Sequence, residues 1–212
     1  MAFSDFSGPD YIDDWWRDLN ERWPERVPIS EYLVRRLVSW CERSNNTEHS
    51  ILELGVGGGA LAASVLDALE KANIQPLHFT GIDIEPELTR QVEGRLSGVT
   101  QTRIHIYDAD LREPGWKEYL GRFDVIYSLQ TFHDLGGHGA LTAIYQRIFS
   151  LLSAGGLLIN ADFVIPFPND NPEKPRRLPV DTHHHILTTL GYTGFKNEIS
   201  MGRLACMTAG RD

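Results

Sequence analysis

The sequence is poor in cysteine, in long apolar runs and in clustered positive charge. Its 212 residues include two cysteines, Cys41 and Cys206, which are far apart and have no metal-ligand spacing. This excludes a disulfide scaffold or a cysteine zinc site, and it favours a reducing, cytoplasmic compartment. No apolar run approaches the roughly 20 residues of a membrane-spanning helix. The first six residues have neither the basic nor the apolar region of a secretory signal. We therefore expect no membrane partner.

Acidic residues outnumber basic ones, and the formal net charge is −9. Basic residues form only short pairs such as Arg35-Arg36 and Arg176-Arg177. A nucleic acid is a poor partner for such a surface, because its phosphates need concentrated positive charge. Hydrophobic residues make up 42% of the chain, enough for one buried core. The composition thus indicates one globular domain, with room for a small cap.

Short apolar runs alternate with amphipathic stretches along the middle of the chain. This alternation predicts an α/β domain with a mainly parallel sheet that is covered on both faces. Gly155-Gly156 is expected to end the helix before the fifth strand, and Gly202 to mark a final hairpin. A proline-rich surface loop over 164–180 and a short helix over 183–190 are expected between them. The expected strands are 50–54, 77–83, 102–107, 123–128, 157–163, 194–200 and 203–208.

Glycines follow the first expected strand, in the run Glu53-Leu54-Gly55-Val56-Gly57-Gly58-Gly59. Glycine is needed where a ligand lies against the main chain, although a tight strand–helix turn would use it too. Gly55, Gly57 and Ala60 also fit the dinucleotide fingerprint of a nicotinamide-dependent oxidoreductase. Two carboxylates on the same edge, Glu53 and Asp110, argue against that reading. They would lie near an anionic diphosphate, whereas they suit a cationic amine or sulfonium.

Taken together, these motifs make the chain similar to the class I S-adenosylmethionine-dependent methyltransferases. The motifs are Glu53-x-Gly55-x-Gly57-x-Gly59, Asp83, Asp110-Leu111, Phe123–Ile126, Leu152–Gly156 and the final hairpin. Ser153-Ala154 departs from the Lys/Arg-Pro pair usual in the family. The resemblance implies a Rossmann-like seven-stranded sheet of order 3-2-1-4-5-7-6, with strand 7 antiparallel and helices on both faces. It also implies an N-terminal helical cap or lid over 1–45, before a methyltransferase domain over 46–212.

The resemblance further implies how the cofactor S-adenosylmethionine, which leaves as S-adenosylhomocysteine, would be bound. The Gly55, Gly57 and Gly59 backbone would approach its amino-acid and ribose portions, with Glu53 near the ammonium group. Asp83, followed by Ile84, would accept hydrogen bonds from the ribose hydroxyls, unless it only caps a helix. Asp110 rather than Asp108 would accept from the adenine amino group while Leu111 packs on the ring. Ser128 and Leu129 end the fourth strand, at the edge where open α/β sheets bind ligands.

His133 is the candidate catalytic residue, because it lies just beyond that fourth strand. An imidazole accepts a proton near neutral pH, which a hydroxyl acceptor requires. A histidine here could instead only shape the pocket, and Asp134 could orient it or cap the next helix. O-methylation of a small molecule is therefore favoured, with N- and C-methylation open.

The acceptor pocket is expected to be aromatic, with Tyr11, Trp15, Trp16, His133 and Phe163 as substrate residues; the tryptophans could equally be plain core packing. No metal is expected. His183, His184 and His185 point about 100° apart on a helix and cannot converge on one ion. Asn160 and Asp162 resemble part of the metal site of catechol O-methyltransferases, but Ser128 stands where an acid is needed. A non-catalytic protein that binds the cofactor and regulates or scaffolds a partner is the alternative. The sequence does not predict the oligomeric state.

Overall fold

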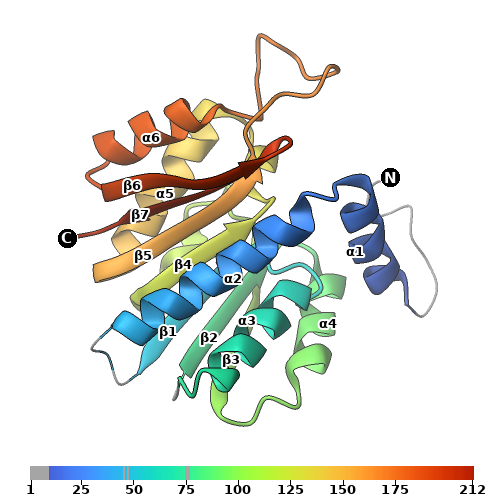
Figure 1. Ribbon diagram of the computed structural model, residues 1–212, viewed down its shortest axis with the longest axis vertical. Helices are drawn as coiled ribbons and strands as arrows, with labels where there is room; N and C mark the ends of the chain where they lie inside the picture. The colour runs from blue at the N-terminus through green and yellow to red at the C-terminus, as the bar shows by residue number, and fades with distance from the viewer. Residues whose placement is uncertain (1–9, 45, 47, 75–76) are drawn as a thin grey trace.

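A seven-stranded sheet of order β3-β2-β1-β4-β5-β7-β6 forms the centre of the protein. This computed structural model describes residues 10–44, 46, 48–74 and 77–212. Neighbouring strands are parallel except that β7 runs antiparallel to both β5 and β6. The predicted fold and strand order are therefore confirmed (Figure 1). The strands are β1 (His49–Leu54), β2 (Leu77–Asp83), β3 (Thr102–Asp108), β4 (Phe123–Leu129), β5 (Leu152–Phe163), β6 (Thr193–Met201) and β7 (Leu204–Gly210).

Helices cover both faces of this sheet, as predicted (Figure 1). One face carries α2 (Arg26–Arg43), α3 (Ala60–Lys71) and α4 (Pro86–Leu96), and the other carries α5 (His138–Leu151) and α6 (Val180–Thr189). Two short 3-10 helices, η2 (Gly115–Lys117) and η3 (Phe132–Asp134), precede and follow β4. None of the helices described here combines the length and apolarity that crossing a membrane requires.

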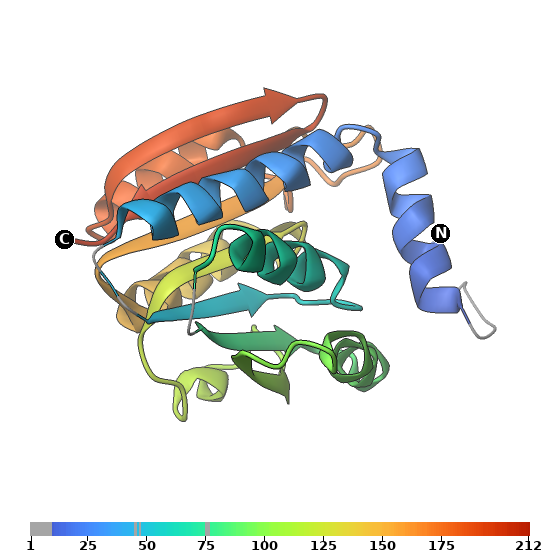
Figure 2. The same cartoon turned by 60° about the horizontal axis from the view of Figure 1, so that its bottom comes forward.

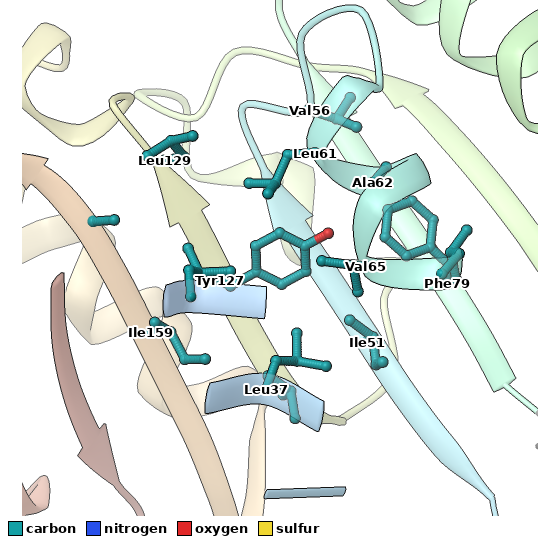
Figure 3. Close-up of a cluster of buried hydrophobic side chains, with 14 of the residues drawn as sticks. Leu37, Ile51, Val56, Leu61, Ala62, Val65, Phe79, Tyr127, Leu129 and Ile159 are labelled. Atoms are coloured by element: carbon teal, nitrogen blue, oxygen red, sulfur yellow. The ribbon is translucent and has the colours of Figure 1, made fainter. Parts of the chain in front are cut away.

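The two helical layers bury separate clusters on opposite faces of the same strands. Consecutive strand residues point to opposite faces, so Ile51 joins the α2–α3–α4 cluster while Leu52 joins the α5–α6 cluster. In Figure 3, the Tyr127 ring lies among side chains that include Leu37 of α2 and Val65 of α3. This double burial explains why the inner strands β1, β4 and β5 are mainly apolar on both faces, whereas the edge strands β3 and β6 include exposed polar residues.

The start of β5 differs from the prediction. The helix before it ends at Leu151, and the strand begins at Leu152 rather than at 157. Leu152 pairs with Phe123, and its carbonyl accepts hydrogen bonds from the guanidinium groups of Arg122 at 3.1 Å and Arg211 at 2.8 Å. Because these contacts fix Leu152 at the sheet, the two glycines lie within the strand and do not end the helix.

The two N-terminal helices occupy different positions. Helix α2 packs against α3, β5 and β7, on one face of the sheet. Helix α1 (Tyr11–Arg22) lies beyond the carboxyl ends of the parallel strands (Figure 2). It stands where a cap over a ligand would stand, whereas the division of the chain at residue 45 stays a prediction.

Candidate active site

A cavity of about 780 Å³ opens at the carboxyl ends of β1, β2 and β4. The strand order reverses between β1 and β4, which is where open α/β sheets bind ligands. Helix α1 closes one side with Trp15, Trp16 and Leu19. The cavity is lined by most of the predicted site residues, namely Trp15, Trp16, Glu53, Gly55, Gly57, Asp83, Ile84, Asp110, Leu111, Leu129, His133 and Phe163.

Three predicted residues do not line this cavity. Gly59 directly precedes α3 with φ of +77°, and an added Cβ would lie 3.0 Å from the Val92 side chain. Ser128 is fully buried and donates its hydroxyl to the Leu54 carbonyl at 2.8 Å. The hydroxyl of Tyr11 donates to Glu87, a cavity residue, at 2.9 Å. Gly59, Ser128 and Tyr11 thus contact residues next to or within the cavity wall and do not line the cavity themselves.

The first glycine of the loop is also required by contacts within the protein. Gly55 has φ of +76°, a left-handed conformation that other residues adopt at a cost. A Cβ at this position would also overlap the side chain of Thr131. Glycine is therefore required here by its backbone conformation and by contact with the chain that follows β4, and the approach of a ligand to this backbone stays a prediction.

Glu53 is a buried carboxyl group on the wall of the cavity. Its side chain is 2% exposed, and the Tyr127 hydroxyl donates to Oε2 at 2.8 Å. The pKa of Glu53 is raised to about 8, chiefly by burial and in smaller part by the nearby Asp83, while the hydrogen bond from Tyr127 opposes the rise. A ligand with positive charge would favour the ionised form of this group.

Asp83 ends β2 with both carboxylate oxygens in use. Oδ2 accepts the backbone N–H of Gly57 at 2.8 Å and Oδ1 that of Glu85 at 3.1 Å. Burial raises its pKa despite these hydrogen bonds. Each oxygen keeps a further lone pair, so the carboxylate can still accept two hydroxyl donors from a ligand.

Asp110 faces the cavity, while Asp108 does not line it. Asp108 instead accepts a hydrogen bond from Thr89 of α4. Asp110 is held by a bidentate contact with Arg112, whose Nη2 lies 2.6 Å from Oδ2. That hydrogen bonding lowers the pKa of Asp110, so it is an ionised acceptor. The structure thus places at the cavity the acid that the Asp-Leu pairing singled out.

His133 of η3 contacts the buried carboxylate of Asp162 on β5. Its Nδ1 lies 2.6 Å from Oδ1, and its backbone N–H donates to Oδ2 at 2.9 Å. The other ring nitrogen, Nε2, lies 3.4 Å from Asp134. Burial lowers the pKa of His133, but the charge and hydrogen bond of Asp162 outweigh it and raise that pKa above its usual value. Asp162 stays ionised, since the imidazole and two backbone N–H groups lower its pKa despite burial.

Aromatic rings surround the histidine. The Phe163 ring meets the imidazole edge-on with centroids 5.1 Å apart, and Trp23 and Phe167 pack on Phe163. The proline-rich segment reaches the cavity through Arg176, which binds the cavity residue Asp134 at 2.5 Å. The His133 ring therefore packs on an aromatic cluster, with the ion pair of Arg176 and Asp134 close to it.

A family model described as "Methyltransferase domain" matches residues 52–158, half of the chain. The chain belongs to this family of S-adenosylmethionine-dependent methyltransferases. The predicted family and cofactor are thereby confirmed, since its members use S-adenosylmethionine as methyl donor. No curated protein matches the chain by sequence.

Several solved structures share the fold of this chain. The DszA carbon methyltransferase has a TM-score of 0.70 and 20% identity, covering 86% of this chain and 53% of its own. The CMeT domain of the citrinin polyketide synthase has a TM-score of 0.65 and 17% identity, covering 79% and 48%. The S-adenosylmethionine-dependent methyltransferase SibL, in its apo form, has a TM-score of 0.63 and 14% identity, covering 99% and 64%. The chain thus spans about half the length of the first two.

The sequence analysis does not identify three functional candidates, which are Asp162 as a partner of His133, Gln130 and Arg26. Asp162 was considered only as a metal ligand, although the parallel pairing of β4 and β5 brings its strand end beside His133. Gln130 directly follows β4, and its φ of +56° is unusual for a residue with a side chain. Arg26 lies 104 residues away from Gln130 and has no local signal. Among the described residues, no group of three or more His, Cys, Asp or Glu is arranged to hold a metal ion.

Proposed function

We propose that this protein transfers the methyl group of S-adenosylmethionine to a small molecule, with His133 as general base and a hydroxyl oxygen as the favoured acceptor. The observation that carries the proposal is that His133, which the buried Asp162 contacts from behind the wall, lines the same cavity as Glu53 and Asp83. The cavity joins a proton acceptor to carboxylates suited to a cationic donor.

The residues present fit this donor. When bound, it supplies a methyl carbon on a positively charged sulfur, which takes back the bonding electron pair as the methyl group leaves. Glu53 would pair with its ammonium group, which relieves the cost of an ionised buried carboxyl. Asp83 would accept from the ribose hydroxyls, and Asp110 from the adenine amino group beside Leu111.

His133 would take the proton that the acceptor must lose. With Nδ1–H donated to Asp162, the Nε2 lone pair would accept the proton of the acceptor hydroxyl, and Asp134, 3.4 Å from Nε2, would stabilise the ring once it is protonated. The freed electron pair of the oxygen then forms the bond to the methyl carbon. Asp162 also stabilises the imidazolium that results. The cavity walls hold the two reactants in line, and such alignment lowers the barrier by up to ~7–11 kcal/mol.

A carbon acceptor is the second candidate. Two of the three solved structures named above carry "carbon methyltransferase" or "CMeT domain" in their names. A buried base of raised pKa could equally remove a proton from a carbon that lies between two carbonyl groups. The roles proposed above for Glu53, Asp83, Asp110 and His133 are the same whether oxygen or carbon receives the methyl group.

Binding and turnover are tested separately. Calorimetry with S-adenosylhomocysteine tests the donor site, and methyl transfer from labelled donor to a panel of phenols and β-keto esters tests the reaction. Nuclear magnetic resonance of the product distinguishes an O-methyl from a C-methyl group. If S-adenosylhomocysteine does not bind at high micromolar concentration, the proposal is wrong. Tight binding with no transfer across the panel would instead support a non-catalytic binding protein.

A further inference from the structure

Asp134 lies between two partners that can carry positive charge. Its Oδ2 is 3.4 Å from Nε2 of His133, and its Oδ1 accepts a hydrogen bond from Nη2 of Arg176 at 2.5 Å. The same guanidinium contacts the backbone carbonyls of Asp134 and His133, at 3.3 and 3.4 Å. Asp134 lines the cavity, and Nε2 is the ring nitrogen that Asp162 does not contact. The carboxylate is therefore shared unequally, and its closer contact is the one with Arg176.

The chain on both sides of Arg176 is fixed by packing. A Cβ added to Gly137, which follows η3, would lie 2.6 Å from the Pro175 carbonyl, so the proline-rich segment packs directly on the loop after η3. On the other side, Arg177 forms an ion pair with Asp170. The side chain of Arg176 is 50% exposed, and an exposed ion pair is normally weak because two long side chains must be ordered. Here the backbone that carries the guanidinium is already held beside η3.

Without this guanidinium, the cationic partner left for Asp134 beside the cavity would be the protonated ring of His133. Asp162 already contacts Nδ1, so a second carboxylate at Nε2 would give the imidazolium an anion at each nitrogen. An opposite charge close to a titratable group favours its charged form. His133 would then keep a proton on the nitrogen that must receive one from the acceptor.

Other charged and titratable groups face His133 from the elements around it. Burial and Arg177 lower the pKa of His133, whereas Asp162 and Asp134 raise it. On α6, His183 lines a small cavity together with His133 and Asp162, and burial lowers the pKa of His183, so this neighbour is neutral near pH 7. Of the two acids, Asp134 is the one beside Nε2. Its position therefore acts on the nitrogen that faces the acceptor.

We propose that Arg176 is a positioning residue, which holds Asp134 away from Nε2 of His133 and so keeps that nitrogen open to the acceptor. Arg176 does not line the main cavity, so it acts through Asp134 and not by touching the acceptor. The inference rests on the proposed function, in which His133 accepts the proton.

A double-mutant cycle on the ligand-free protein tests this role. Nuclear magnetic resonance follows the ring protons of His133 through a pH titration, and His133→Ala assigns them. Arg176→Met should raise the pKa of His133 by roughly 0.5 unit or more, because Asp134 is then free to pair with the protonated ring. Asp134→Asn should lower that pKa, and adding Arg176→Met to Asp134→Asn should change it no further. Lys174→Met is the matched control, because it removes an exposed positive charge from the same segment and should cause no shift.

The cycle separates a moved carboxylate from a lost charge. If Arg176 acted only through its own positive charge, Arg176→Met would raise the pKa of His133 equally with and without Asp134. That result, or no shift in Arg176→Met, would overturn the role of Arg176.

Turnover supplies a second measurement. In Arg176→Met, the acidic limb of kcat should move to higher pH, and the rate should recover towards the wild-type value above that limb. Adding Asp134→Asn should move the limb back, a rescue that a merely structural defect would not show. The titration needs no turnover, so the two proposals fail separately. Full turnover in His133→Ala would refute the base and leave the titration result in place, whereas an acidic limb that ignores Arg176 while turnover depends on His133 would refute the positioning role alone.

Discussion

The two sides of the cavity are built in different ways. The acidic side consists of Glu53, Asp83 and Asp110, at or just beyond the carboxyl ends of β1, β2 and β3. The histidine side consists of Trp16, His133 and Phe163, from α1, η3 and the end of β5. Backbone pairing of adjacent strands places the acids, whereas side-chain contacts place the histidine. A site of the first kind can be found from strand ends, while one of the second kind needs the folded chain.

Replacement of His133 is expected to have the largest effect, and it falls on the histidine side alone. His133→Ala removes the proton acceptor, and loss of a general base typically costs about 10²–10⁴-fold in rate. The acids of the other side stay in place, so the affinity for S-adenosylhomocysteine should be unchanged. Steady-state kinetics and calorimetry measure the two quantities.

His185→Ala is the matched control for this variant, because His185 is exposed on α6 and does not line the cavity. Full turnover in His133→Ala would show that the histidine only shapes the pocket. A parallel loss of cofactor affinity would show that the two sides are not independent.

The acidic side should respond in the opposite way. Asp83→Ala removes the acceptor expected for two ribose hydroxyls and also frees the Gly57 and Glu85 backbone N–H groups. Hydrogen bonds to a charged group contribute about 1.5–3 kcal/mol, which corresponds to roughly a 10–100-fold loss of affinity for S-adenosylhomocysteine. Turnover at saturating cofactor should fall little. The exposed acid Asp67 of α3 offers a control, Asp67→Ala. Unchanged affinity in Asp83→Ala would remove the ribose assignment.

The acidic side of the cavity can be predicted from the sequence better than the histidine side. The sheet order and the acids at its edge follow from apolar runs, a glycine loop and family motifs, since each signal is local. Asp162 and Arg26 act through partners that are distant along the chain, and only the packing of β5 and α2 brings them to the cavity. The contact of Gly55 with Thr131, 76 residues further along the chain, is likewise set by the folded structure and has no local signal in the sequence.

Asp162→Asn keeps His133 in place but should change its pKa, so it tests the histidine side of the cavity without removing the proposed base. The carboxylate raises the pKa of His133, so a neutral amide should lower that pKa. Activity, which needs the unprotonated imidazole, should then persist to lower pH, while the plateau rate falls about tenfold because the ring loses an ionic partner. A pH profile of kcat measures both. An acidic limb that stays in place, with only the rate reduced, would mean that another group titrates there.

The smallest effect is expected at Glu53, and it concerns protons rather than rate. The pKa of about 8 leaves this carboxyl mostly protonated at pH 7, between Tyr127 and Asp83. A bound ammonium group stabilises the ionised form, so binding of S-adenosylhomocysteine should release up to about one proton. Its affinity should rise with pH and level off above pH 8. Calorimetry in two buffers of different ionisation enthalpy counts the protons.

The variant Glu53→Gln should release no proton on binding and should bind S-adenosylhomocysteine a few-fold more weakly. Without ligand, the wild type should lose stability as pH rises from 4.5 towards 8, and Glu53→Gln should not show this loss. That loss arises because the unfolded chain releases this proton first. The same proton count in both proteins would place the ammonium group away from Glu53, and the acidic side would then hold its ligand by hydrogen bonds alone.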